Sequence, residues 1–285
     1  MGKVSNPYNF NIKDNYKSYS KIGFELVDLS NYAQKNIPNY QTITEIPQEH
    51  MNYINSVRAI NTTNMFYQCS SLTTLDISNF DTSFTTDMNS MFYSCSSLVT
   101  LDVSNFNTSN VTDMHAMFSM CESVTNLDVS NFDTSKVTDM AYMFGSCESV
   151  TTLDVSNFNT SKVTDMTGMF STCRLLTNLD VSNFNTSNVT DMSTMFKDCD
   201  SLTTLDLSNF DTSKVTDMYQ MFRGCNNLTT IIGTLDMSNV ERCTLMFLRS
   251  DNLKNVHLKN VPRSLDLSDT DGTEGVTYIV DNYID

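Results

Sequence analysis

Residues 98–123 have the sequence LVTLDVSNFNTSNVTDMHAMFSMCES, and residues 124–149 repeat its pattern as VTNLDVSNFDTSKVTDMAYMFGSCES. Regular cysteines give the register, one every 26 residues: Cys69, Cys95, Cys121, Cys147, Cys173, Cys199 and Cys225. Self-similarity at a fixed period of this size is typical of a solenoid, in which each unit buries its apolar face against its neighbours. The sequence therefore predicts a continuous array in place of a conventional globular domain.

Two different periods lie within one repeat. Leu101 and Val103 alternate with polar residues, which is typical of a short strand with one buried face. Apolar residues then recur at i, i+3, i+4 and i+7, at Met114, Met117, Phe118 and Cys121. This second spacing predicts a short helix, with Thr112 or Asp113 placed to cap its N-terminus.

The strand segment also follows the leucine-rich-repeat pattern L-x-x-L-x-L-x-x-N, with Phe106 in place of the asparagine. This replacement predicts an aromatic spine at Phe80, Phe106, Phe132, Phe158, Phe184 and Phe210. The asparagine before each of them, Asn105 in this repeat, is expected to satisfy turn backbone groups. We therefore predict an α/β fold: a leucine-rich-repeat solenoid with a parallel strand ladder on one face, short helices on the other, and caps at both ends.

The repeated units MFSMCESVTNLDVSNFDTSKVTDM (117–140) and MFKDCDSLTTLDLSNFDTSKVTDM (195–218) resemble the 26-residue repeats of BspA-like leucine-rich-repeat surface proteins. That family is common in low-GC Gram-positive bacteria, mycoplasmas and some of their phages. The resemblance implies a non-enzymatic adhesion or binding scaffold, and it names no target. Family members that reach the bacterial surface usually carry an export signal and an anchor. We find neither in this sequence, which raises a virion component as the alternative.

Four segments follow from the register. We predict an extended N-terminal arm at 1–20, an N-terminal cap at 21–61, the solenoid at 62–247 and a C-terminal cap at 248–285. The arm is interpreted either as a disordered tail or as a segment that docks on a neighbouring subunit. Within the caps we expect strands near 25–29 and 42–46, and a closing strand at Thr277–Val280.

Composition excludes several partners and chemistries. A formal net charge of −16 with 17 basic residues argues against nucleic acid, because phosphate binding needs a basic stripe. No segment reaches the ~18 apolar residues of a membrane helix, so no membrane insertion is expected. The cysteines form no C-x-x-C pair, so we predict buried free thiols, with disulfides between neighbouring repeats as the alternative. No nucleophile elbow or phosphate loop is found, and no enzymatic activity is expected.

Stacking turns each repeat position into a column, and one column on the strand face is acidic: Asp76, Asp102, Asp128, Asp154, Asp180 and Asp206. Unit charges about 4.8 Å apart repel by ~1 kcal/mol even in water. Calcium could relieve this repulsion, and we place that hypothesis at Asp102, Asp128 and Asp154. A partner's basic side chains, or flanking hydroxyls such as those of Thr100 and Ser104, are the alternatives. No other cofactor is indicated.

The residues that vary between repeats lie on the predicted helices. The candidates for a discriminating ligand site there are Tyr142, Lys197, Tyr219 and Arg223. The alternative is drift at unconstrained exposed positions. A second aspartate column, which contains Asp113, is interpreted as helix capping.

These observations predict a binding scaffold displayed on a bacterial or phage exterior that recognises a surface polymer or protein. Its partner would be a protein or a surface glycan, with a homo-oligomer or virion subunits as further hypotheses. The alternative function is structural: a virion or assembly component in which the arm docks to a neighbour and the solenoid is a spacer or decoration. The expected location is the extracellular bacterial surface or the virion.

Overall fold

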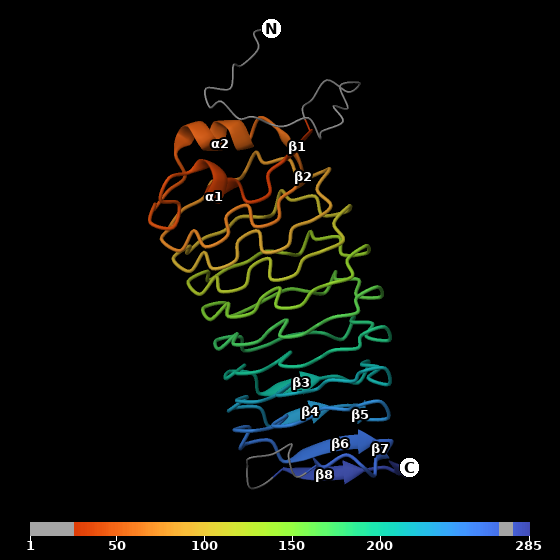
Figure 1. The fold of residues 1–285 in the computed structure, drawn as a ribbon. Helices are drawn as coiled ribbons and strands as arrows, with labels where there is room; N and C mark the ends of the chain where they lie inside the picture. Colours follow the sequence, from red (N-terminus) through yellow and green to blue (C-terminus); the bar gives the residue numbers. More distant parts are fainter. Residues whose placement is uncertain (1–25, 268–275) are drawn as a thin grey trace.

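The chain forms a parallel β-solenoid whose rungs stack from the N-terminal to the C-terminal end (Figure 1). The computed structural model describes residues 26–267 and 276–285, so the predicted arm at 1–20 lies outside the described residues. The named elements are β1 (Leu26–Asp28), α1 (Tyr32–Asn36), α2 (Gln48–Ile54), β2 (Arg58–Asn61), β3 (Thr204–Asp206), β4 (Thr230–Ile232), β5 (Thr234–Asp236), β6 (Asn255–Lys259), β7 (Val261–Pro262), β8 (Thr277–Val280) and β9 (Tyr283–Ile284). The predicted leucine-rich-repeat solenoid is confirmed.

One side of the solenoid carries the predicted parallel ladder. The strands β3 and β4 pair in parallel, with Leu205 opposite Ile231. In earlier rungs the ladder is reduced to single parallel bridges, such as the one between Thr100 and Asn126. Leu101 and Val103 are buried while Asp102 between them is exposed, as the alternating pattern predicts.

The short helices predicted within the repeats are not formed, and double turns stand in their place. Backbone N–H groups alternate between two kinds of partner. Met117 and Ser119 donate to carbonyls of their own rung, at Met114 (3.2 Å) and Ala116 (3.1 Å). Phe118 between them donates to Met143 of the next rung (3.0 Å). An α-helix would keep all of these bonds within the segment, so the fold exchanges half of them for bonds between rungs.

Left-handed backbone conformations produce this alternation. Ala116 has φ 51° and Met120 has φ 60°, and the equivalent residues of other rungs have similar values. The double turn still buries the residues at i, i+3, i+4 and i+7, since Met114, Met117, Phe118 and Cys121 are all 0% exposed. The apolar spacing was therefore a correct guide to burial and a wrong one to backbone conformation.

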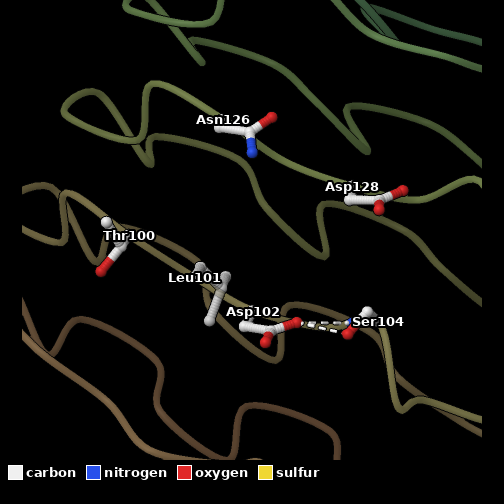
Figure 2. A pocket seen from close by; sticks show the side chains of 6 residues that line it. All are labelled: Thr100, Leu101, Asp102, Ser104, Asn126 and Asp128. Carbon is white, nitrogen blue, oxygen red and sulfur yellow. Dashed lines mark hydrogen bonds between the residues drawn. The ribbon is translucent and has the colours of Figure 1, made fainter.

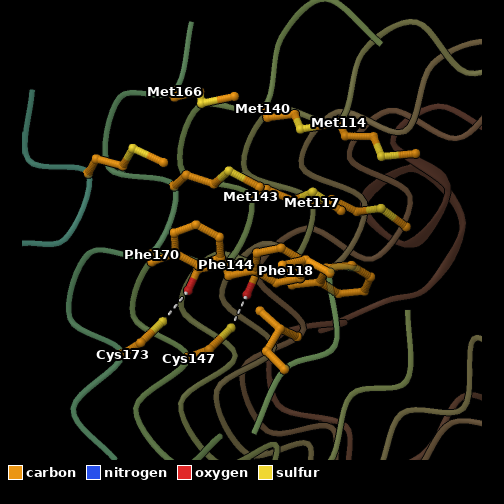
Figure 3. Close-up of a cluster of buried hydrophobic side chains, with 14 of the residues drawn as sticks. Met114, Met117, Phe118, Met140, Met143, Phe144, Cys147, Met166, Phe170 and Cys173 are labelled. Atoms are coloured by element: carbon orange, nitrogen blue, oxygen red, sulfur yellow. Dashed lines mark hydrogen bonds between the residues drawn. The ribbon is translucent and has the colours of Figure 1, made fainter. Parts of the chain in front are cut away.

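The core consists of side-chain columns along the solenoid axis (Figure 3). Phenylalanine rings of successive double turns stack, with centroids 5.9 Å apart between Phe118 and Phe144. Beside them six cysteine thiols donate to a phenylalanine carbonyl of the preceding rung, as Cys147 does to Phe118 (3.3 Å); the six are Cys95, Cys121, Cys147, Cys173, Cys199 and Cys225. All eight cysteines are free and buried, as predicted.

Two polar ladders also join the rungs, one of exposed asparagines and one of buried threonines. The amide of Asn105 donates to the carbonyls of Ile77 (3.0 Å) and Ser78 (3.2 Å) in the rung before it, which confirms the role predicted for this column. A second ladder, which the sequence analysis missed, consists of buried threonines at Thr82, Thr108, Thr134, Thr160, Thr186 and Thr212. Each hydroxyl donates to a carbonyl of the next rung, as Thr134 does to Asn159 (3.1 Å).

The two ends differ from the repeats. The strand β1 pairs with β2, and the helices α1 and α2 lie at this end of the stack (Figure 1). The predicted strand near 42–46 was wrong: these residues form turns and bends that lead into α2. At the other end β6 pairs with β8, which confirms the predicted closing strand. The boundaries drawn between caps and solenoid stay predictions.

Candidate functional site

The strand face presents the predicted aspartate column, whose members are all exposed. Each carboxylate accepts a hydrogen bond from the backbone N–H of the serine two residues later. Oδ1 of Asp102 lies 3.0 Å from the backbone nitrogen of Ser104, and it also accepts a hydrogen bond from the Ser104 hydroxyl at 2.6 Å. These bonds hold the pKa of Asp102 below its usual value, with the hydroxyl as the larger cause. The local serines therefore stabilise the charged form, as one of the predicted alternatives proposes.

A shallow hollow of about 390 Å³ lies on this face. Its lining comes from two neighbouring rungs: Thr100, Leu101, Asp102, Ser104, Asn126 and Asp128 (Figure 2). The side chains include two carboxylates, two hydroxyls and one amide, around the single apolar side chain of Leu101. Such a set can donate and accept hydrogen bonds at several points, which suits a polar ligand.

The metal hypothesis receives no support from clustering. Within residues 26–267 and 276–285, no group of three or more His, Cys, Asp or Glu side chains is placed to hold a metal ion. Asp102 and Asp128 lie on successive rungs of one column, so a cation between them would need further oxygen ligands from a partner or from water.

The second aspartate column caps the first turn of each double turn. The prediction of a capping role was therefore correct, but the capped element is a turn and not a helix. Asp113 accepts the backbone N–H of His115 (2.8 Å), and Asp165 accepts that of Thr167 (2.8 Å). Consecutive members pair as parallel bridges, so the half-buried carboxylates follow one another along the axis. Burial raises the pKa of Asp113, and the neighbouring charges of Asp87 and Asp139 add to that effect.

Tyr142 and Tyr219, two of the four variable candidates, lie in different surroundings. Tyr142 is 39% exposed, and its ring lies across Gly168 of the next rung, where an added Cβ would come 2.3 Å from the ring. Tyr219 is covered, because the guanidinium of Arg242 lies 3.7 Å from its ring centroid. Of these two tyrosines, Tyr142 is therefore the more exposed.

Lys197 and Arg223, the two basic candidates, are brought together around Asp198. The charged groups of Lys197 and Arg223 lie 3.9 Å and 4.0 Å from its carboxylate. In the described part of the chain, the buried Nε of Arg223 has no hydrogen-bond partner. The structure therefore places these two cations in one cluster and leaves the guanidinium of Arg223 incompletely bonded.

Two residues that the sequence analysis did not select complete this turn side. Arg242 pairs with Asp217 (3.1 Å) while it covers Tyr219. His115 lies 3.5 Å from Asp139 and edge-on to Tyr142, with ring centroids 6.2 Å apart. Arg242 stands opposite Asp217, where earlier rungs carry aspartate, but it lies 25 residues after Asp217 and so the 26-residue register gave no signal for it.

Among the described residues, none of the helices has the length and hydropathy to cross a bilayer.

Two solved structures are similar over most of their length. One is a leucine-rich cell surface protein from Faecalibacterium prausnitzii, with 17% identity over 79% of this chain and 77% of that chain and a TM-score of 0.30. The other is a leucine-rich repeat protein from Bacteroides ovatus, with 15% identity over 85% and 83% and a TM-score of 0.33. No curated protein matches the sequence.

A family model matches residues 60–153 and again residues 140–260, which together span most of the chain and nearly all of the solenoid. This match covers the same repeats that carry the resemblance to BspA-like leucine-rich-repeat proteins, and it confirms that resemblance. The chain therefore belongs to the family described as "Mycoplasma protein of unknown function, DUF285".

Proposed function

We propose that this protein is a non-enzymatic binding scaffold whose strand face holds a repetitive surface glycan. The observation that carries the proposal is the uniformity of that face, where Thr or Asn, Asp and Ser recur on successive rungs. Rungs about 4.8 Å apart repeat the same donors and acceptors along the axis. A polymer of identical units is the ligand that such a face suits best.

Chemistry supports a hydroxyl-rich polymer over a flat protein surface. Carboxylates such as Asp102 and Asp128 accept hydrogen bonds from sugar hydroxyls, while Thr100 and the amide of Asn126 can donate to sugar oxygens. The hollow that these residues line has a volume of about 390 Å³, which accommodates a small part of a glycan chain at a time. Affinity would then come from several rungs engaged together.

Calcium belongs to this proposal as a bridge at Asp102, Asp128 and Asp154. In Asp102 the bonds from Ser104 go to Oδ1, so Oδ2 stays available to a cation that sugar hydroxyls also coordinate. A ligand that binds only the native state raises the melting temperature. Millimolar Ca²⁺ should therefore raise it more than Mg²⁺ does, and an unchanged value with both ions would eliminate the calcium bridge.

Display on a bacterial surface or a virion is the setting that we propose for this scaffold. The family resemblance supports an exterior location, and the strand face needs such a location to reach a surface polymer. The finer assignments, adhesion and a bacterial rather than a viral exterior, rest on the same resemblance.

The test is the binding of purified cell-wall polysaccharide to immobilised full-length protein. Replacing Asp102 and Asp128 together with alanine should weaken binding at least about tenfold, because two adjacent acceptors are lost. Asp133→Asn is the matched control, since Asn107 and Asn159 occupy the same position in neighbouring repeats. Equal binding by the double variant and the control would overturn the strand-face assignment.

A further inference from the structure

We propose that the strand face recognises its glycan in units of two rungs, with Asn126 and Asn178 each binding one N-acetyl group of a neutral, extended β-1,4-linked N-acetylhexosamine chain. This inference rests on the proposed function of the strand face and names the class of polymer that the face takes. One column of that face alternates, although the aspartate column beside it does not.

The alternating column lies two residues before the aspartates. From position 100 to position 204 its members are Thr100, Asn126, Thr152, Asn178 and Thr204, and threonine also stands at both ends of the column. Asparagine is depleted in strands, whereas β-branched threonine is favoured there. The two asparagines therefore occupy positions where strand geometry alone favours threonine, and they are two rungs apart.

The backbone pairs these rungs in the same way. A parallel bridge joins Thr100 to Asn126. The next bridge of this column joins Thr152 to Asn178, and β3 pairs with β4 beyond it. Within residues 26–267, no bridge joins Asn126 to Thr152. The hollow of the strand face lies in the first bridged pair, since its lining comes from the rungs of Thr100 and Asn126 (Figure 2). Each of these two bridged pairs thus contains one threonine and one asparagine.

The side-chain amides of Asn126 and Asn178 are open to a ligand. Both residues are exposed, and among the described residues neither amide makes a hydrogen bond within the chain. The amide of Asn131, by contrast, donates to the carbonyl of Ser104 (3.2 Å). A side-chain amide contains both a donor and an acceptor, so it can bind the C=O and the N–H of an N-acetyl group together.

The geometry of the polymer supplies the matching period. Two rungs span about 10 Å along the axis, and two sugars of an extended β-1,4-linked chain span nearly the same length. Successive sugars in such a chain are related by half a turn, so their N-acetyl groups point to alternate sides. One side of the chain therefore presents an N-acetyl group at every second sugar, which is the spacing from Asn126 to Asn178.

The aspartates of the same face favour a neutral chain. Asp102 and Asp128 line the hollow, and both they and the net charge of −16 would repel an acidic polysaccharide. The hydroxyls of a neutral chain can donate to these carboxylates. Once Asn126 holds one N-acetyl group, the contact at Asn178 forms within the same complex, so the two contacts reinforce each other.

The test compares the β-1,4-linked hexamer of N-acetylglucosamine with cellohexaose, which has the same backbone and a hydroxyl in place of each N-acetyl group. The full-length wild type should bind the N-acetylated hexamer at least about fivefold more tightly, because it gains two amide contacts. Replacing Asn126 and Asn178 together with threonine should bring the two affinities together. Threonine is natural at this position in the neighbouring rungs, so the variant should fold. Equal affinities in the wild type, or a preference that survives in the double variant, would overturn the proposal.

The spacing is tested with a variant that keeps two asparagines. Asn178→Thr combined with Thr152→Asn places them on adjacent rungs, where only one of them can meet an N-acetyl group on the facing side of the chain. Its preference for the N-acetylated hexamer should be no greater than that of Asn178→Thr alone. A preference as large as that of the wild type would overturn the two-rung unit.

Purified cell-wall polysaccharide is measured beside the two hexamers, so that this inference and the proposed function can fail separately. If the wild type binds the polysaccharide and neither hexamer, the strand face keeps its proposed function and the N-acetylhexosamine unit is wrong. If it binds none of the three ligands, the proposed function fails and this inference fails with it.

Discussion

At the scale of single residues, the rungs are joined by buried side chains that replace backbone partners. Thr134 is 1% exposed, donates its hydroxyl to the carbonyl of Asn159 (3.1 Å) and accepts the N–H of the same residue (2.7 Å). One hydroxyl therefore satisfies two backbone groups of the next rung. A buried backbone group without a partner destabilises a protein by about 1–3 kcal/mol.

We therefore expect Thr134→Val to lower the free energy of unfolding by about 2 kcal/mol, because valine keeps the shape and leaves both groups of Asn159 unpaired. Urea unfolding followed by circular dichroism measures the change. Thr138→Val is the control, since the Thr138 hydroxyl donates to Thr112 (3.2 Å) at an exposed position where water can replace it. Similar losses in the two variants would contradict the role of burial.

Cysteine thiols at the same scale should be inert in the native protein. Burial raises the pKa of Cys121 and of Cys173 to about 12, so the reactive thiolate is scarce at neutral pH. We expect a thiol reagent at about pH 8 to modify none of the eight cysteines in the folded chain and all of them in urea. Fast modification of the native protein, or fewer than eight thiols after unfolding without a reductant, would contradict this expectation.

At the scale of the element, the double turn explains what the sequence could and could not predict. The solenoid and its register follow from a strict repeat, and burial follows from the apolar spacing. Backbone conformation does not follow, because Met114, Met117, Phe118 and Cys121 would occupy one stripe in a helix as well. The residue types at the positive-φ positions do not reveal the double turn either. Glycine would be the expected signal there, and only Gly168 and Gly224 are glycines at these positions of the repeats.

Part of the candidate site could likewise be predicted from the sequence, and part could not. The Asp and Ser columns could be predicted from the repeat, and so could the bonds between them. The stacking of Arg242 on Tyr219 could not, because Arg242 lies 25 residues after Asp217 and so falls outside the 26-residue register. Contacts that depend on a shift in register need coordinates.

Positive φ gives a test of the double turn. Thr172 has φ 62°, where a β-branched residue is strained by ~1 kcal/mol and glycine is not. Thr172→Gly should therefore leave stability unchanged or raise it by up to about 1 kcal/mol. Thr167→Gly, in the same double turn without a positive φ, should lower it by about 1 kcal/mol. Urea unfolding midpoints measure both changes in stability. A larger decrease for Thr172→Gly than for Thr167→Gly would contradict the left-handed conformation of Thr172.

The N-terminal helices should respond to pH through His50 of α2. Its Nδ1 lies 3.0 Å from the hydroxyl of Tyr32 in α1, and burial lowers its pKa in the folded state. The unfolded chain then binds the proton more readily than the folded chain. The free energy of unfolding is therefore highest above about pH 6.5 and decreases as the pH falls towards the folded pKa of His50. We expect His50→Gln to reduce the fall in urea midpoint between about pH 7.5 and pH 5.

His115 provides the control of opposite sign. Its bond to Asp139 raises its pKa, so its contribution is present at low pH and is lost as the pH rises through the folded pKa. His115→Asn should therefore enlarge the fall in urea midpoint on acidification. Parallel pH profiles for the wild type and His50→Gln would show that His50 does not control this response.

At the scale of the whole molecule, stability comes from contacts between neighbouring rungs. Most of the polar bonds described above join residues 25 to 29 positions apart, as in the bonds of Thr134 to Asn159 and of Cys147 to Phe118. A solenoid of this kind is quasi-one-dimensional, and its stability is approximately a sum over rungs and interfaces. Its length can therefore change by whole repeats without a new fold.

Deletion of residues 124–149 tests this directly, because it joins Ser123 to Val150 in a context where serine already precedes valine. We expect a folded protein with one rung fewer, seven free thiols and an unfolding m-value lower by roughly a tenth, since m scales with the surface exposed on unfolding. Deletion of residues 124–136 is the control: it removes half a repeat, brings strand positions against turn positions and should prevent cooperative unfolding. If the half-repeat deletion folded as well as the full one, rung-to-rung register would not be what holds the molecule together.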